Sequence, residues 1–87
     1  MYKVIWEKRA QKDLKKIDFI LVKKIVEKVE TYLAQDPVNI GEPLRHDYKG
    51  LFRFRFEDYR VIYQIEHQQI LIIVIEVGHR REIYRKR

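Results

Sequence analysis

The stretch Ile70–Val77, with the sequence ILIIVIEV, decides the fold. Its first six residues are β-branched or leucine, a composition that favours a β-strand. The stretch is too short to cross a membrane. An unbroken apolar strand is usually covered on both faces, so we expect it in the centre of a sheet. Gly78 follows, and then a basic tail, His79–Arg87. The strand therefore predicts an edge of the molecule at which cations, an imidazole and a phenol are gathered.

Two further strands precede this stretch, and both alternate in side-chain direction. Leu51–Glu57 reads LFRFRFE, so its phenylalanines share one face and its charged residues the other. Tyr59–Glu66 reads YRVIYQIE and returns antiparallel, with turns expected at Asp58 and at His67–Gln69. The three segments predict an antiparallel meander. The face opposite the apolar one carries Arg53, Arg55, Glu57, Arg60, Ile62 and Gln64.

The first part of the chain predicts one strand and two helices. Lys3–Glu7 is expected to be a strand, and Lys8–Ile17 repeats apolar residues at spacings of four and three, as a helix does. Asp18 is an N-cap candidate for a second helix, which must end before Pro37. A coiled-coil seam is disfavoured because the apolar stripe of this helix covers only about two heptads. That stripe consists of Val22, Ile25, Val26, Val29, Tyr32 and Leu33.

The expected order of elements is β-α-α-β-β-β, with Leu44–Tyr48 as a short connection that includes one turn of strand. We therefore predict an α+β fold in which the two N-terminal helices pack on one face of a small antiparallel-rich sheet. The other face would be left with Arg53, Arg55, Arg60 and the basic tail.

Composition indicates a small globular protein. The 87 residues are expected to form one domain, 1–87, with 46% hydrophobic and 37% charged residues. There is no cysteine, which excludes disulfides and thiolate zinc sites. The N-terminus reaches charge at Lys3 and Glu7, too early for a signal peptide, and no stretch is suited to span a membrane. We therefore expect a cytoplasmic protein without a membrane partner.

Positive charge is concentrated at the C-terminus. The net charge is +6, and residues 78–87 carry five Lys or Arg against one Glu, a net of +4. Residues 1–35 carry nine Lys or Arg against five Asp or Glu, also +4, over a much longer surface. Such a dense patch favours a polyanion or an acidic protein as partner.

Four features converge if the meander forms: Arg53 or Arg55, Arg60, the His79–Arg81 turn and Tyr84. Cleavage of RNA without a metal requires a base for the 2′-hydroxyl, a cation for the phosphorane and an acid for the leaving oxygen. Arginine suits the second role because its planar guanidinium matches phosphate oxygens. The imidazole of His79 and the phenol of Tyr84, if neighbouring cations lower its pKa, suit proton transfer. The catalytic candidates are Arg60, Arg80, Tyr84 and His79; the substrate-binding candidates are Arg53, Arg55, Arg81, Arg85, Lys49 and Arg45.

Each candidate also has an ordinary structural interpretation. His79 would be a surface imidazole beside a turn, Tyr84 a packing aromatic, Arg53 and Arg55 the wet face of an amphipathic strand, and Arg60 a partner of Glu57 or Asp58. The histidines at 46, 67 and 79 lie in unrelated elements, so we expect no metal site and no cofactor. Serine and cysteine are both absent, which excludes those nucleophiles.

Three segments together resemble the RelE/ParE superfamily of bacterial and archaeal type II toxins: LFRFR at 51–55, YRVIY at 59–63 and VGHRREIYR at 77–85. The resemblance covers essentially the whole chain and implies the RelE-like fold. RelE-like members are ribosome-dependent mRNA endonucleases that cut A-site codons without a metal. The resemblance implies phosphate contact by Arg60, transition-state stabilisation by Arg80, and stacking or proton transfer by Tyr84.

The resemblance also implies partners and alternatives. Arg53, Arg55 and His79 stand where RelE has lysines, and because arginine cannot act as a base near neutral pH, either His79 or Tyr84 would take the 2′ proton. A cognate antitoxin is expected to cover the basic face, the ribosome and mRNA are expected partners, and DNA would be bound only through the antitoxin complex. The alternatives are a ParE-like inhibitor of DNA gyrase and a non-catalytic member that binds only antitoxin or RNA.

Overall fold

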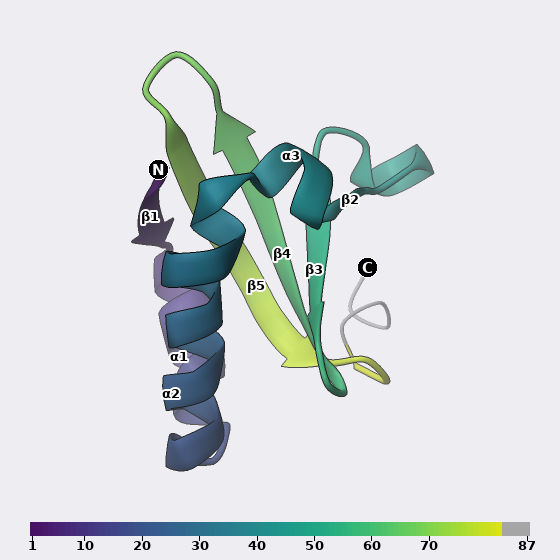
Figure 1. Cartoon of the computed structure of the whole chain (residues 1–87). Helices are drawn as coiled ribbons and strands as arrows, with labels where there is room; N and C mark the ends of the chain where they lie inside the picture. The colour runs from purple at the N-terminus through teal and green to yellow at the C-terminus, as the bar shows by residue number, and fades with distance from the viewer. Residues whose placement is uncertain (83–87) are drawn as a thin grey trace.

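The computed structural model describes residues 1–82, which form a five-stranded sheet with helices on one side (Figure 1). The strand order is β1-β5-β4-β3-β2. Strand β1 runs parallel to β5, and the other neighbours are antiparallel. The predicted α+β order is confirmed, with additional short elements between the helices and the meander. The strands are β1 (Lys3–Trp6), β2 (Glu42–Pro43), β3 (Phe52–Phe56), β4 (Tyr59–Glu66) and β5 (Leu71–His79).

Strand β5 lies between β1 and β4, in the central position that the apolar stretch predicts. It begins at Leu71, because Ile70 adopts a positive φ of 56° in the preceding turn, and it continues through His79. The expectation of cover on both faces is only half right. Ile72 and Val74 are buried, whereas the alternating Leu71, Ile73 and Ile75 are only partly buried.

A β-bulge changes the side-chain direction near the end of β5. Ile62 of β4 faces Glu76, but Tyr63 faces Val74, so Ile75 is passed over in the register. One extra residue reverses the alternation that follows it. Val77 therefore shares the face of Ile72 and Val74, which a regular strand would not allow.

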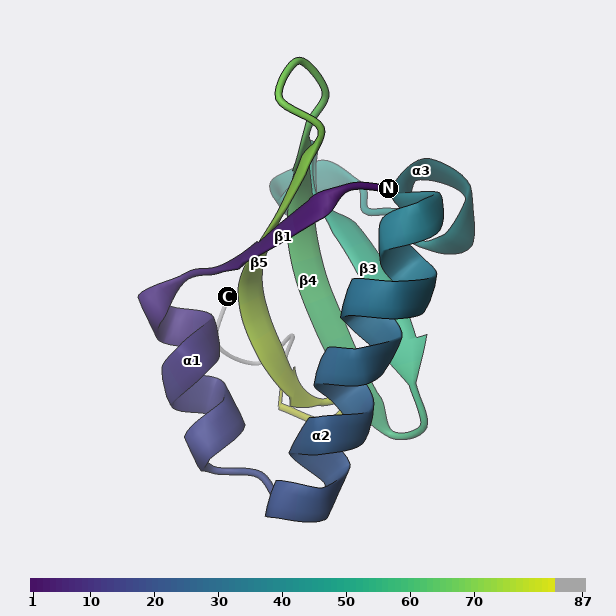
Figure 2. The same cartoon turned by 60° about the vertical axis from the view of Figure 1, so that its left-hand side comes forward.

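The helices α1 (Lys8–Lys15) and α2 (Phe19–Glu27) both lie on that face of the sheet (Figure 2). The predicted cap of α2 is confirmed, because the Asp18 carboxylate accepts hydrogen bonds from the N–H groups of Ile20 and Leu21. Helix α2 continues through a π-helical turn and a 3-10 turn, as far as Gln35. The core between the layers is formed by Ala10, Ile25, Val29, Leu33, Ala34, Phe54, Val61, Tyr63, Ile72, Val74 and Val77.

The connection between the helices and the meander differs from the prediction. A short helix, α3 (Pro37–Ile40), is followed by β2, whose residues Glu42 and Pro43 pair with Arg53 and Phe52. The prediction of a short strand segment within Leu44–Tyr48 is wrong, since His46–Tyr48 forms a 3-10 turn. Proline is tolerated in β2 because this strand forms the edge of the sheet.

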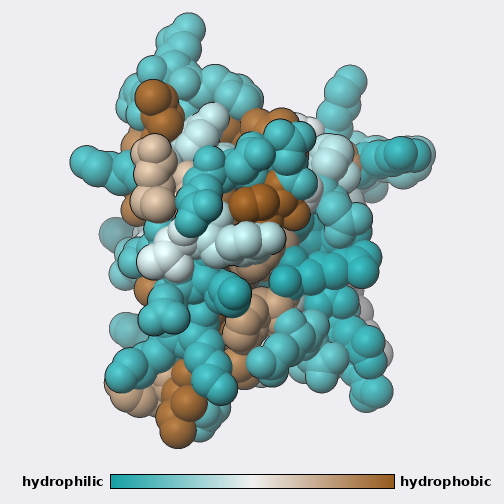
Figure 3. All heavy atoms as spheres, in the orientation of Figure 1, coloured by the Kyte–Doolittle hydropathy of each residue, from teal (hydrophilic) through white to brown (hydrophobic). Residues whose placement is uncertain are grey.

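The surface is mostly hydrophilic in the view of Figure 3, with hydrophobic side chains in separate patches. No helix within residues 1–82 is long and apolar enough to span a membrane. The large hydrophobic side chains that are exposed include Phe19, Ile20 and Ile70.

Candidate functional site

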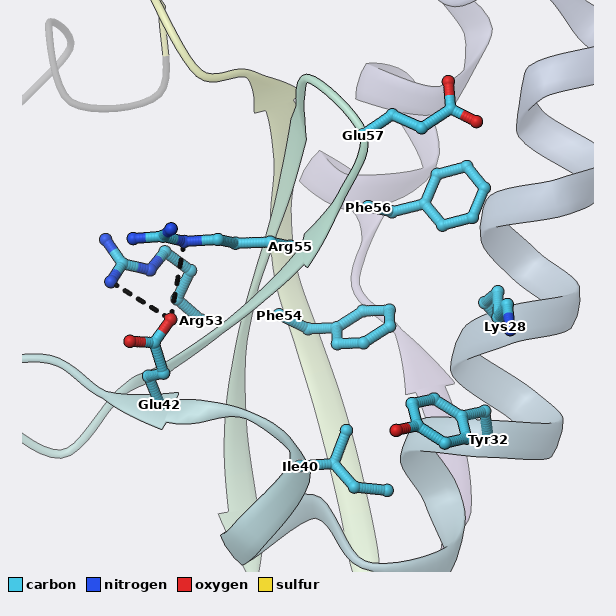
Figure 4. Close-up of a pocket in the computed structure, with 9 residues that line it drawn as sticks. All are labelled: Lys28, Tyr32, Ile40, Glu42, Arg53, Phe54, Arg55, Phe56 and Glu57. Carbon is cyan, nitrogen blue, oxygen red and sulfur yellow. Dashed lines mark hydrogen bonds and ion pairs between the residues drawn. The ribbon is translucent and has the colours of Figure 1, made fainter.

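Two arginines of β3 project from the sheet on the side away from the helices and share one carboxylate (Figure 4). Glu42 Oε1 lies 3.3 Å from Arg53 Nη2 and 3.4 Å from Arg55 Nε. Phe54 and Phe56 point to the opposite side, as the alternation predicts, toward Lys28 and Tyr32 (Figure 4). The single negative charge of Glu42 in β2 thus stands against the two positive charges of Arg53 and Arg55 in β3.

A hollow of about 410 Å³ lies on the phenylalanine side of β3. The alternation that sends the arginines to one side sends the aromatic rings into this hollow (Figure 4). It is lined by Lys28, Tyr32, Ile40, Glu42, Arg53, Phe54, Arg55, Phe56 and Glu57.

The side of the sheet away from the helices, which carries Arg53 and Arg55, is called the cationic face. Arg60 extends this face onto β4. It stands directly opposite Arg55 in the register of β3 and β4, and opposite Gly78 in that of β4 and β5. Its Nη1 donates hydrogen bonds to the carbonyl oxygens of Glu57 (3.1 Å) and Tyr59 (3.0 Å). These two hydrogen bonds orient the guanidinium group.

Arg80 lies at the same end of the sheet, in the turn after β5. Its backbone N–H donates to the Asp58 carbonyl oxygen at 2.7 Å, and its Nε lies 3.8 Å from Asp58 Oδ1. The Arg80 side chain is about half exposed. Arg80 comes two residues after Gly78, the residue that faces Arg60. The β3–β4 turn thus anchors Arg80 at the end of the sheet where Arg55 and Arg60 stand opposite each other.

His79 does not join this cluster, which corrects the expected convergence. The bulge at Ile75 turns His79 to the helix-covered face, where it faces Tyr59 in the register. The two rings meet edge to face, with centroids 5.6 Å apart. His79 Nδ1 accepts a hydrogen bond from the Arg81 N–H at 3.2 Å, so the neutral ring carries its proton on Nε2. The imidazole lines a hollow of about 230 Å³ shared with α1, away from Arg60.

The other predicted residues are spread over the chain. Arg81 is exposed in the turn after β5. Arg45 and Lys49 are also exposed, but they lie near the start of β3, whereas Arg80 is held by the turn at the other end of this strand. Tyr84 and Arg85 lie outside the described residues. Within residues 1–82, no three His, Asp or Glu side chains gather as metal ligands would.

Sequence reasoning missed a buried polar contact between α1 and β5. Asp13 is buried, and its Oδ2 accepts a hydrogen bond of 3.0 Å from the Val77 N–H. Glu76 is also buried and lies 3.4 Å from Arg9 Nη2. A signal was present, because Asp13 follows Ala10 by three positions and so falls on the apolar stripe of α1.

Tyr63, the last residue of the YRVIY segment, is part of the core. Its hydroxyl donates to the Pro37 carbonyl oxygen at 2.6 Å, which ties β4 to the start of α3. Burial, and secondarily the Asp36 carboxylate, raises the pKa of the Tyr63 phenol well above its ordinary value. Tyr63 is therefore a neutral structural residue, in contrast to Arg60 of the same strand.

Comparison with known proteins agrees with this fold. The family model described as "ParE toxin of type II toxin-antitoxin system, parDE" matches residues 4–84. Toxin RelG of Mycobacterium tuberculosis is 32% identical over 85 residues, which cover 98% of each chain. Toxin RelE of the same organism is 33% identical over 84 residues.

Solved structures give the same result. The toxin–antitoxin complex RelBE2 from Mycobacterium tuberculosis contains a chain with a TM-score of 0.87 and 30% identity, and 93% of each chain is covered. The archaeal RelE–RelB complex from Pyrococcus horikoshii contains a chain with a TM-score of 0.71 and 25% identity, with 93% of this chain and 97% of that chain covered. The fold and the sequence define a toxin of the type II toxin–antitoxin class. Within that class, the chain belongs to the RelE/ParE superfamily.

Proposed function

We propose that this toxin is an endoribonuclease that cuts mRNA in the ribosomal A site and so inhibits translation. The observation that carries the proposal is the row formed by Arg55 and Arg60, with Arg80 at the same end of the sheet. Arg55 and Arg60 lie on the face that the helices leave open, where an RNA backbone could approach, and Asp58 holds Arg80 at the same end of the sheet. Support also comes from the named relatives, toxins RelG and RelE.

The proposed reaction is transfer of the phosphoryl group within the RNA, without a metal or cofactor. The 2′-oxygen attacks the adjacent phosphorus as its proton leaves, the bond from phosphorus to the 5′-oxygen breaks, and a donor protonates that 5′-oxygen. The products are a 2′,3′-cyclic phosphate and a 5′-hydroxyl. Arg55 and Arg60 would bind the non-bridging oxygens, and Arg80 would stabilise the additional negative charge of the phosphorane.

We propose that Tyr84 takes the proton of the 2′-hydroxyl. This role rests on the resemblance of its segment, residues 77–85, to the superfamily. His79 is a weaker candidate for the base than the sequence suggested, because its Nδ1 already accepts the Arg81 N–H. We propose that His79 instead closes the turn that carries Arg80. The binding roles of Arg53, Arg81, Arg85, Arg45 and Lys49 remain proposals, and those of Arg45 and Lys49 require an RNA that extends along the sheet.

A cognate antitoxin is the proposed protein partner. One chain of similar fold was solved in the toxin–antitoxin complex RelBE2, and another in an archaeal RelE–RelB complex. A net charge of +6 would favour an acidic segment over the arginines, which would block RNA. We further propose that the toxin acts in the cytoplasm, where the ribosome and mRNA are found, and contacts DNA only through the antitoxin.

Primer extension on mRNA translated in a purified system tests the proposal. Wild type should produce cuts within A-site codons, and Arg80→Ala should reduce the cleavage rate on the order of 100- to 1,000-fold. The matched control is Lys24→Ala, which removes one exposed cation from α2 and should cleave like wild type. Full cleavage by a folded Arg80→Ala variant would contradict the proposed role, and equal loss in both variants would indicate only an effect of net charge.

A gyrase inhibitor is the second candidate, because the matching family model describes ParE. This alternative predicts inhibited supercoiling and DNA breaks, while mRNA stays intact. A supercoiling assay with purified gyrase separates the two candidates. Uncut mRNA together with normal supercoiling would leave a non-catalytic, binding-only member.

A further inference from the structure

Helix α1 takes the place of a missing strand beside the end of β5. Strand β1 pairs with Leu71–Val74 of β5 and then ends, and the Glu7 N–H donates to the Val74 carbonyl oxygen as the last contact of this edge. Beyond that point β5 continues to His79 without β1. The backbone groups of β5 that face this side therefore require partners from another element.

Asp13 supplies such a partner at Val77. Its Oδ2 lies 3.0 Å from the Val77 nitrogen, and both residues are buried. One turn earlier on α1, Arg9 pairs with Glu76, the neighbour of Val77. The helix thus holds two successive residues of β5 through polar contacts, and the bond to the carboxylate is of the stronger, charge-assisted kind.

The segment held in this way leads directly into the turn with Arg80. Val77 is anchored by Asp13, and the Arg80 N–H is anchored by the Asp58 carbonyl oxygen at 2.7 Å. Gly78 lies between these anchors and has no side chain to restrict the backbone. The path of the chain from Val77 to Arg80 is therefore set by contacts at its two ends.

We propose that Asp13 is a positioning residue, which fixes the end of β5 and thereby the turn that carries Arg80. The proposal rests on the proposed function only in assigning Arg80 to the reaction. Asp13 itself lies on the helix side of the sheet, and it acts on the cationic face through the backbone of β5.

Two substitutions separate the hydrogen bond from the charge. Asp13→Leu keeps the bulk and removes the acceptor, whereas Asp13→Asn keeps an oxygen acceptor and removes the charge. The control is Asp18→Ala, which removes another aspartate that accepts backbone N–H groups, but at the start of α2 and away from β5. All variants are full-length chains made by cell-free synthesis, and their folding is checked by circular dichroism.

Amide hydrogen exchange, measured by NMR at Val77 and Arg80, is the first readout. Asp13→Leu should accelerate exchange at both amides by about 10- to 100-fold, because local opening of this edge becomes easier. Asp13→Asn should restore protection to within about threefold of wild type. Asp18→Ala should change the exchange rates of these two amides no more than its effect on the global stability of the protein accounts for.

The second readout is the kinetics of mRNA cleavage on the ribosome. Asp13→Leu should lower kcat on the order of 10- to 100-fold with little change in KM, as expected for a misplaced catalytic group. Faster exchange at Val77 with unchanged Arg80 exchange and kcat would show a purely structural contact and overturn the proposal. If wild type cleaves no RNA, the proposed function fails, but the exchange at Arg80 still decides whether Asp13 fixes the turn.

Discussion

Arg55 and Arg60 stand directly opposite each other in the register of β3 and β4, so two guanidinium groups share one cross-strand position. Like charges at such a position oppose folding. Glu42 offsets this only in part, because the same carboxylate oxygen also contacts Arg53. Two opposed arginines lower the stability of the fold, and such a pair is expected where the protein binds a negatively charged ligand.

The first prediction is that removal of Arg55 stabilises the fold and weakens the toxin. Arg55→Thr removes the repulsion with Arg60 and introduces a residue that favours strands. The free energy of unfolding should rise by about 0.2–1 kcal/mol, while mRNA cleavage declines. Urea unfolding and primer extension on the same samples provide the two measurements.

Arg45→Thr serves as the control for this prediction. It removes the same charge from an exposed loop position, outside the paired strands. It should not increase the free energy of unfolding. A loss of stability in Arg55→Thr would show that the contact with Glu42 outweighs the repulsion.

The second prediction concerns the carboxylate beside Arg80. Asp58 Oδ1 lies 3.8 Å from Arg80 Nε, and both side chains are more than half exposed, so the ion pair adds little stability. Asp58→Asn keeps the backbone carbonyl that accepts the Arg80 N–H and removes one negative charge. The variant should bind a single-stranded RNA more tightly and show a steeper dependence of affinity on salt, by about 0.7 in the slope of log K against log salt.

Fluorescence anisotropy with a labelled RNA at several salt concentrations measures this effect. Asp47→Asn makes the same change of charge at the far end of the sheet, in the 3-10 turn. Equal effects of the two substitutions would mean that net charge, and not proximity to Arg80, controls RNA binding.

The elements in which apolar and polar residues recur with a clear period could be predicted from the sequence. The alternation of Phe and Arg in β3 fixed both faces of the strand, and the capping aspartate before α2 marked its first residue. Strand β2 was missed because two residues, one of them Pro43, carry no period. Its pairing with Arg53 and Phe52 depends on tertiary contacts that no local pattern reports.

The cationic face was also predictable, but not the position of His79. Arg53, Arg55 and Arg60 follow the alternation of their strands, so their common face could be inferred. A bulge inside the uniform apolar run of β5 leaves no trace in its composition, and it moved His79 to the other face. Asp13 falls on the apolar stripe of α1, but its partner Val77 lies 64 residues away in the sequence, and no local pattern reports that contact.

The third prediction concerns the contact between Gly41 and Tyr63. A Cβ atom at Gly41 would overlap the Tyr63 hydroxyl and lie 2.8 Å from its Cζ and 3.1 Å from the Arg53 carbonyl oxygen. Gly41→Ala should therefore lower the free energy of unfolding by about 1–3 kcal/mol or more, as overpacking does. Thermal and urea unfolding measure the loss.

A double-mutant cycle identifies the cause of that loss. In a Tyr63→Phe background the hydroxyl is gone, so Gly41→Ala should cost less, with a coupling of about 0.5–3 kcal/mol. Gly50→Ala should show no coupling to Tyr63→Phe, because a Cβ at Gly50 meets nothing within 4 Å. Additive effects of Gly41→Ala and Tyr63→Phe would show that the backbone of this loop shifts to avoid the hydroxyl.

The last prediction is a loss of stability in alkali that depends on Tyr63. Burial, and secondarily the Asp36 carboxylate, raises the pKa of this phenol in the folded protein. In the unfolded chain the phenol ionises near its ordinary pKa of about 10. Between these two values the unfolded chain loses a proton that the folded protein keeps, so the contribution of Tyr63 to stability is complete below about pH 10 and declines above it. The free energy of unfolding should fall by up to about 1.4 kcal/mol per pH unit from this group.

Tyr63→Phe and Tyr32→Phe form the matched pair for this experiment, since Tyr63 is fully buried and Tyr32 is 46% exposed. Tyr63→Phe should be less stable at pH 7 by about 1–3 kcal/mol, because the Pro37 carbonyl loses its donor, and it should lose the alkaline decline. Tyr32→Phe should retain the decline, as should wild type, in urea unfolding at pH 8 to pH 11. The same decline in all three proteins would assign the alkaline transition to groups other than Tyr63.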